Sequence, residues 1–182
     1  EGLKQDVADA FFELVCELEA WGQLTEVVGA LLDGDVVSLG DGDLRHQVIE
    51  RAATVFQDTA NRLDDARICN EFILQEDPEN DAALKRLDIL LTSIGDVPAL
   101  VEVLEVRLAC VPEAEQRVNL AIRLAELHEE RLSQPDEAAA VYMLVRDDVP
   151  EGDHRVHNAL GRIFAATEQW SPLVEVLTEH AE

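Results

Sequence analysis

One pentapeptide occurs twice in this chain without a change. It is Leu-Val-Glu-Val-Leu, at residues 100–104 and again at 173–177, 73 positions later. A looser copy, Leu-Thr-Glu-Val-Val, occupies residues 24–28. Each copy follows a short turn and a hydrophobic segment of similar pattern. Repetition at such a spacing is typical of a stack of small structural units and not of one closed globule.

Glycine and proline are confined to narrow places, and the stretches between them are rich in helix formers. The apolar residues in these stretches recur with helical spacing, which predicts ten helices. They group into five pairs, at about residues 5–33, 43–76, 79–110, 114–148 and 153–181. Residues 44–112 and 115–182 are therefore interpreted as two copies of one four-helix unit.

Residues that are expected to begin or end helices recur at equivalent places. Three prolines are expected to end helices: Pro78, Pro112 and Pro150. Four polar residues are expected to cap the second helix of a pair: Asn61, Asp96, Ser133 and Ser171. The first helix carries a predicted apolar stripe made of Val7, Ala10, Phe11, Leu14, Val15 and Leu18.

The pairs match a known repeat pattern, in which a small residue and an aromatic residue recur at fixed offsets and a proline closes the unit. The fifth pair carries Leu160, Gly161, Phe164, Trp170 and Leu173 at the required spacings. The fourth carries Ala138, Tyr142, Val145 and Pro150, and the third carries Leu87, Leu91, Gly95, Leu100, Leu104 and Pro112. The second carries Ala66, Ile73 and Pro78, with Asn70 in place of the expected aromatic.

The chain thus resembles the tetratricopeptide-repeat family over nearly its whole length. The resemblance implies an all-α fold, an α-solenoid (a right-handed superhelix) of about five antiparallel helical hairpins. It also implies a single repeat domain over residues 1–182, and a concave groove lined by the first helix of each pair. Proteins of this family bind protein or peptide segments in that groove.

The net charge of the chain is −25, from 39 acidic and 14 basic residues. Such a surface repels phosphate, so we expect no nucleic-acid partner and no acidic membrane surface. No run approaches the ~20 apolar residues of a membrane-spanning helix. The sequence does not start with Met, and we expect it to be a fragment of a longer protein that lacks its own N-terminus.

Candidate chemical sites have simpler structural interpretations. Cys16, Cys69 and Cys110 sit in apolar helical patterns and are expected to be buried thiols in a reducing, cytoplasmic compartment. The aspartate-rich loop at residues 33–43 does not keep the spacing of a calcium-binding loop and is interpreted as a solvated turn. His154 and His157 could share a metal, although a third ligand is missing from the pattern.

Trp21 and Trp170 hold equivalent places after a hairpin turn, where we expect them to pack in the core, with ligand stacking as the alternative. No phosphate-binding loop, nucleophile elbow or zinc-protease motif occurs. We therefore predict no catalytic site, no cofactor and no metal.

Basic residues give the sharpest functional indication. Most lie in or beside the first helix of a pair, and Arg51, Lys85 and Arg123 hold equivalent positions, with Asn158 next. The predicted peptide-binding groove comprises Arg51, Lys85, Arg86, Arg123, Asn158 and Arg162. It would suit an acidic or C-terminal peptide. The alternative is that these cations pair with nearby carboxylates such as Glu50, Asp88 and Glu126.

The predicted function is a non-enzymatic scaffold for protein–protein interaction. The alternative is a regulatory or ligand-sensing module attached to an enzyme, or to a transport or secretion component, elsewhere in the parent chain. The last helix carries Leu173, Val176 and Leu177, with no polar capping helix after it. Either the parent chain continues, or a homo-oligomer forms through this helix.

Overall fold

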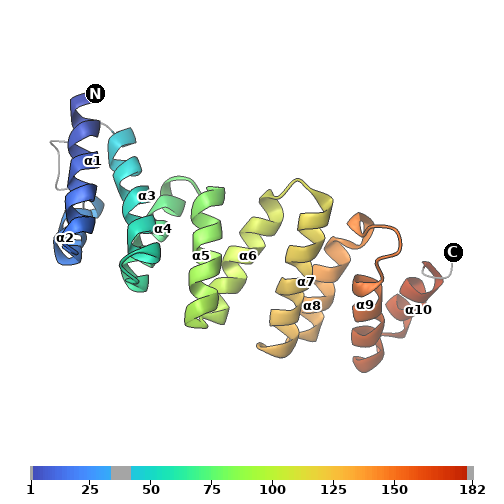
Figure 1. Ribbon diagram of the computed structural model, residues 1–182. Helices are drawn as coiled ribbons and strands as arrows, with labels where there is room; N and C mark the ends of the chain where they lie inside the picture. Colours follow the sequence, from blue (N-terminus) through green and yellow to red (C-terminus); the bar gives the residue numbers. More distant parts are fainter. Residues whose placement is uncertain (1, 34–41, 180–182) are drawn as a thin grey trace. The chain divides into compact units, whose positions relative to one another are not determined.

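The computed structural model describes residues 2–33 and 42–179, and this part of the chain contains helices and no strand (Figure 1). The described residues form ten α-helices, which are α1 (Gly2–Glu17), α2 (Trp21–Leu32), α3 (Gly42–Asp58), α4 (Leu63–Glu76), α5 (Asp81–Ile94), α6 (Val97–Cys110), α7 (Ala114–Glu130), α8 (Pro135–Leu144), α9 (Arg155–Ala166) and α10 (Trp170–Glu179). The all-α prediction is confirmed for these residues. The aspartate-rich loop falls almost wholly on residues 34–41, outside the described part. No described helix is both long and apolar enough to cross a membrane.

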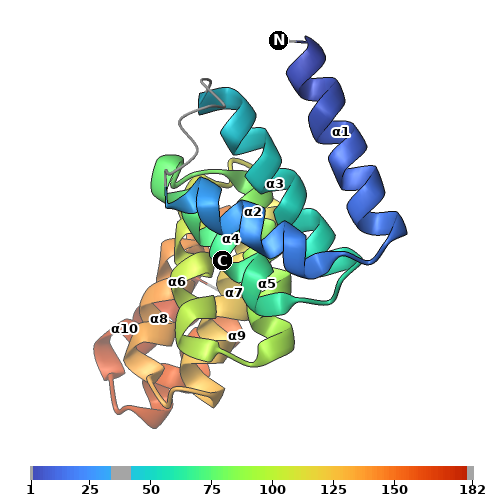
Figure 2. The ribbon, with the colours of Figure 1, turned by 90° about the vertical axis from the view of Figure 1, so that its left-hand side faces the viewer.

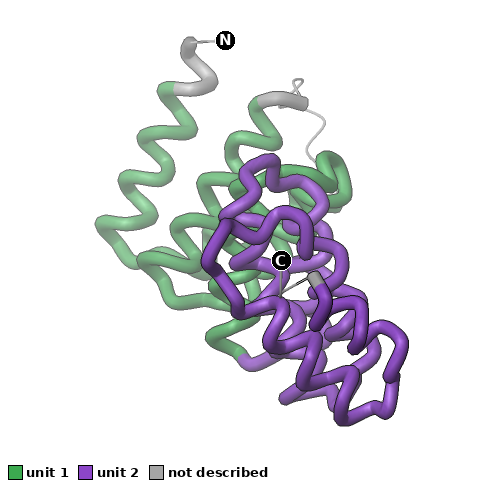
Figure 3. The backbone as a smooth tube through the Cα atoms, turned by 90° about the vertical axis from the view of Figure 1, so that its right-hand side faces the viewer, with its two compact units in different colours: residues 1–94 green, residues 95–182 purple. Residues whose placement is uncertain are grey.

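The chain divides into two compact units, residues 1–94 with α1 to α5 and residues 95–182 with α6 to α10 (Figure 3). Within each unit, every helix packs against the helix that follows it. Within a unit, a helix that lies between two others therefore buries one edge against its hairpin partner and another edge against the neighbouring hairpin, as a helical repeat requires. The boundary between the units falls between the two helices that the sequence predicts as the third pair.

A residue with left-handed backbone conformation stands between the two helices of each pair predicted from the sequence, and these pairs are called hairpins by their order in the chain. These left-handed turn residues are Glu19, Asn61, Gly95, Ser133 and Glu168, with φ between 50° and 80°. Asn61 and Ser133 were predicted as helix caps, and that prediction is wrong. The N-cap residues are Arg62 and Gln134, and neither side chain caps its helix. Both residues instead adopt the positive φ at which the chain reverses, a conformation that asparagine tolerates better than serine does.

The turns are of two kinds, which alternate along the chain. In the first, third and fifth hairpins, the carbonyl of the left-handed residue accepts a hydrogen bond from the amide two residues later. An example is Val97 N–H to Gly95 O at 3.0 Å. In the second and fourth, the amide of the next residue reaches the carbonyl six positions earlier. Arg62 N–H donates to Phe56 O and Gln134 N–H to His128 O, both at 2.8 Å. The period of two hairpins agrees with the four-helix unit interpreted from the sequence.

Helix ends follow the predicted proline pattern. Pro78 and Pro112 lie two residues beyond the ends of α4 and α6. The last predicted turn of α8 differs, since the helix ends at Leu144 and a 3₁₀ turn, Arg146–Asp148, leads to Pro150. Asp96 caps α6 as predicted, because its carboxylate accepts the Ala99 N–H at 3.3 Å.

Ser171 does not cap α10, since that helix begins one residue earlier, at Trp170. The predicted stripe of α1 also needs correction. Phe12 and Val15 are buried, whereas Val7, Leu14 and Leu18 are exposed. The small and large residues expected between helices are placed as predicted, with Ala66, Ala138, Tyr142 and Phe164 buried.

Candidate peptide-binding surface

Four of the six predicted groove residues share one structural position. Arg51, Lys85, Arg123 and Asn158 each lie ten residues before the left-handed turn residue of their hairpin. Asp9 holds the same position in the first hairpin. It was not predicted, and its spacing of ten residues to Glu19 is the signal that identifies it. We call this the ladder position, made of Asp9, Arg51, Lys85, Arg123 and Asn158.

Arg51 joins α3 to α1. Its guanidinium forms an ion pair with Asp9 and lies over the ring of Phe12, 4.6 Å from the ring centroid. The side chains of Arg51 and Asp9 remain 41% and 48% exposed, so water still screens the pair. A cation over an aromatic face gains further attraction from the ring quadrupole. Arg51 is thus held in one place while part of its guanidinium stays accessible.

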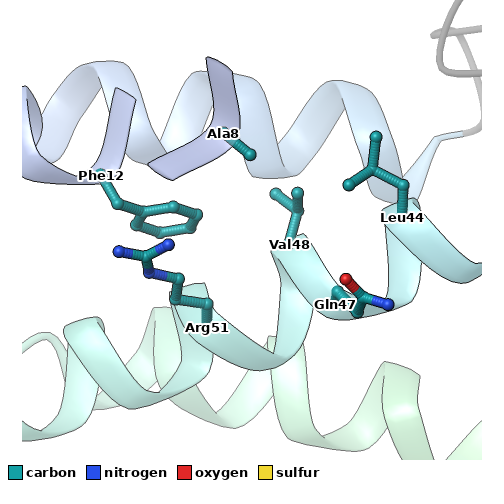
Figure 4. Close-up of a pocket in the computed structure, with 6 residues that line it drawn as sticks. All are labelled: Ala8, Phe12, Leu44, Gln47, Val48 and Arg51. Carbon is teal, nitrogen blue, oxygen red and sulfur yellow. The ribbon is translucent and has the colours of Figure 1, made fainter. Parts of the chain in front are cut away.

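A crevice opens between α1 and α3 beside Arg51 (Figure 4). Figure 2 shows these two helices next to one another. The lining residues are Ala8, Phe12, Leu44, Gln47, Val48 and Arg51. The volume of the crevice is about 20 Å³, and the crevice opens to solvent. A single water molecule needs roughly 10–15 Å³ by the same measure. The crevice is therefore a shallow notch against which one side chain can rest, and not a pocket that encloses a ligand.

The other cations of the predicted set have partners within the chain. Lys85 Nζ donates to Asp81 Oδ2 at 2.6 Å, one turn away on α5. Arg162 donates from both terminal nitrogens to Glu129 on α7, at 2.8 Å each. The hydrogen bond to Glu129 is the main cause of a raised pKa of Arg162. Arg123 also interacts within the chain, whereas Asn158 is exposed.

Arg86 reaches inward from α5 to α4. Its Nε donates to Asn70 Oδ1 at 2.8 Å, and Asn70 Nδ2 donates to the Ala66 carbonyl at 2.8 Å. Asn70 is fully buried. Asn70, which departs from the repeat pattern, therefore forms a buried polar link between two hairpins. Arg86 contributes to this packing in addition to any contact with a ligand.

The cysteines differ from their predicted burial. Cys69 is buried, but Cys16 and Cys110 are exposed. Burial is the main cause that raises the pKa of the Cys69 thiol to about 12, and the charge of Asp65 adds to it. Cys69 is an inert thiol at neutral pH, because the thiolate is the reactive form.

Trp170 is exposed, so its predicted place in the core is wrong, while Trp21 is half-buried. His154 holds the N-cap position of α9 without a capping hydrogen bond from its side chain, and His157 lies within that helix. Among the described residues, no three His, Cys, Asp or Glu side chains gather as metal ligands would. The nearby Asp153 accepts hydrogen bonds from Arg155, which lower its pKa to about 2, and so belongs to a salt bridge at the helix start.

No protein-family model matches the sequence, and no curated protein matches it. Solved structures do match the fold. A point mutant of MamA aligns with a TM-score of 0.50 and 16% identity, over 98% of this chain and 98% of that chain. A candidate kinesin light chain from Podosopora anserina with nearly identical TPR-like repeats aligns with a TM-score of 0.46 and 16% identity, over 96% of this chain and 92% of that chain. The similarity concerns the fold, which is that of a tetratricopeptide-like helical repeat.

Proposed function

We propose that this chain is a non-enzymatic protein-interaction module that holds a short peptide segment against the crevice between α1 and α3. The observation that carries the proposal is the juxtaposition in that crevice. The apolar side chains of Phe12, Leu44 and Val48 line the crevice beside the partly exposed side chain of Arg51. The arrangement suits one apolar side chain with one carboxylate beside it.

The charge of the molecule limits the ligand further. With a net charge of −25, the chain repels a segment that carries many acidic residues. A single carboxylate can still exchange with Asp9 at Arg51, because an exposed ion pair contributes only ~1 kcal/mol or less. A C-terminal apolar residue meets both conditions, since its side chain and its α-carboxylate are both bonded to its Cα atom.

A display library of random peptides with free C-termini tests the proposal. The wild-type chain should enrich peptides that end in an apolar residue. Ala8→Trp fills the crevice without changing charge and should abolish that enrichment. Ala140→Trp, at an exposed position on α8, is the matched control and should leave it intact. Equal enrichment by Ala8→Trp and wild type, with unchanged circular dichroism, would refute the crevice as the site.

Lys85, Arg86, Arg123, Asn158 and Arg162 remain candidates for contacts along the rest of the peptide. Reversing Arg51, Lys85 and Arg123 to Glu tests the wider groove with the same library. The single variant Arg51→Glu is measured beside the triple variant. If the single variant already loses the enrichment, the site is restricted to the crevice. Loss only in the triple variant would extend it along the ladder position, and retention of affinity in the triple variant would rule out both.

A further inference from the structure

The two identical pentapeptides lie in equivalent helices but are covered differently. Leu104, the last residue of the copy on α6, is fully buried, whereas its equivalent on α10, Leu177, is 56% exposed. Val101 and Val174 differ in the same way. Trp170 begins the same exposed strip, at the position where α6 has the buried Val97. The sequence of this strip is therefore suited to burial, and the described residues leave it uncovered.

The left-handed turn residues allow the comparison to be made for every hairpin. Leu177 lies nine residues after Glu168. The residues at that position in the other four hairpins are all buried: Val28, Asn70, Leu104 and Tyr142. In the second unit, α6 packs against α7, the first helix of the next hairpin. A first helix is thus the type of element that normally packs on this side of a second helix.

The first helix of the first hairpin shows the complementary exception. Val7 and Leu14 lie twelve and five residues before Glu19 and are 63% and 53% exposed. The residues at the same two positions in the other hairpins are all buried: Ile49 and Phe56, Ala83 and Leu90, Ala121 and His128, Val156 and Ile163. Only α1 leaves both positions exposed among the described helices.

Helix α9 shows on which side of a first helix these two positions lie. A Cβ on Gly161 would lie 4.0 Å from Leu173 Cδ1, so the Gly161 edge faces α10. At ~100° per residue, Val156 and Ile163 lie roughly 150° around the helix from Gly161. They therefore belong to the edge away from α10, and α8 of the preceding hairpin also packs on α9. Val7 and Leu14 occupy the corresponding edge of α1, where a preceding second helix would pack.

We propose that α10 of one copy of this chain docks against α1 of a second copy, head to tail. The contact repeats the arrangement of α7 on α6. It joins the α10 face (Trp170, Val174 and Leu177) to the α1 face (Val7, Leu14 and Leu18), and all six side chains are exposed in the single chain. A second copy is the occupant because this chain itself supplies both halves of the interface, each with the residue types that its other hairpins bury at the same positions.

The assembly has two properties that follow from this geometry. A head-to-tail contact uses two different surfaces, so it forms open chains or closed rings and not a symmetric dimer. Each copy also carries a net charge of −25, so the copies repel one another. Since salt screens that repulsion and leaves the apolar contact in place, association should strengthen as ionic strength rises.

Sedimentation velocity with the full chain tests the proposal. We expect species heavier than 20.2 kDa that grow with protein concentration. They should be more abundant at ~1 M than at ~0.1 M NaCl, where the Debye lengths are about 3 and 10 Å. Leu14→Glu and Leu177→Glu should each weaken association about tenfold or more, because each brings a charge into an apolar contact. Leu144→Glu, at another exposed position near a helix end, is the control and should associate as the wild type does.

Mixing the two variants gives the decisive result. Leu14→Glu keeps a working α10 face and Leu177→Glu keeps a working α1 face, so an equal mixture should form a dimer and stop there. A chain that stays at 20.2 kDa at every salt and protein concentration would overturn the proposal. So would a mixture with no dimer, or an association that Leu144→Glu weakens as much as the two face variants do. Circular dichroism of each variant establishes that the fold is kept.

Discussion

Asn61 and Ser133, 72 positions apart, hold the same left-handed backbone conformation, with φ of 51° and 57°. In each case the next residue donates its amide to a carbonyl six positions back. Two residues of different chemistry thus perform one task, which is to reverse the chain between helices at a small cost in backbone energy.

Glycine at these two positions should stabilise the protein. Ser133→Gly removes the clash of Cβ in the left-handed region, and we expect a gain of about 0.5 kcal/mol after the entropy of the more flexible unfolded chain is subtracted. Asn61→Gly should gain less, since asparagine tolerates positive φ better than serine. Urea denaturation measures both. Gly95→Ala should move the other way by ~1 kcal/mol, and a stabilising Gly95→Ala would contradict this explanation of the turns.

The buried amide of Asn70 should be costly to remove. Asn70→Ala leaves Arg86 Nε and the Ala66 carbonyl without this partner, and we expect the free energy of unfolding to fall by about 1–3 kcal/mol. The double variant Asn70→Leu with Arg86→Met removes both polar partners and should recover part of the loss. Thermal and urea denaturation test this on the wild type, Asn70→Ala, the single variants Asn70→Leu and Arg86→Met, and the double variant. A loss in the double variant equal to the sum of the losses in Asn70→Leu and Arg86→Met would show that the two residues act independently.

The helix caps provide a comparison within one experiment. Asp96→Ala should destabilise the chain by ~1 kcal/mol, because the Ala99 amide loses its side-chain acceptor. Ser171→Ala should change stability by a few tenths of a kcal/mol at most, because Ser171 lies inside the first turn of α10. The reverse order of the two effects, measured by urea denaturation, would refute these cap assignments.

Alkaline pH should destabilise the protein through Cys69. An unfolded thiol loses its proton near its ordinary pKa of 9.0, whereas burial raises the pKa of Cys69 to about 12 in the folded chain. Between these values the native state binds more protons than the unfolded state, so stability is complete below about pH 9 and is lost as the pH rises toward 12. The slope from this group approaches ~1.4 kcal/mol per pH unit.

The variant Cys69→Ala isolates that contribution. Its free energy of unfolding should be lower than that of the wild type near neutral pH, and the difference should shrink as the pH rises above about 9. Cys16→Ala, at an exposed thiol, is the control and should follow the wild type. Tyr142, whose pKa burial also raises to about 12, should add a second loss above about pH 10 that Tyr142→Phe removes. A constant difference between Cys69→Ala and wild type would contradict the raised pKa.

The repeat period made the helices and their equivalences predictable. The spacing of Pro78, Pro112 and Pro150 indicates where second helices end, and the matching positions of Arg51, Lys85 and Arg123 follow from the same register. These features depend on local sequence, which is why they are readable without a structure.

Features that depend on a neighbour were not predictable in the same way. Periodicity marks Val7 and Leu14 as apolar, but only the packing shows that no described helix covers them. Asn61 has a residue type that often caps helices, but the turn geometry places it one residue before the N-cap position, which Arg62 holds. Asp9 as the partner of Arg51 required an alignment of hairpins through their turns, which the structure provides.

The alternation of the two turn kinds has a consequence for engineering. An internal hairpin cut out of the chain, or a single hairpin inserted within it, would bring two turns of the same kind into succession. Protein designers who wish to shorten or lengthen this protein should therefore move four helices at a time, which is also the step by which gene duplication would have lengthened it.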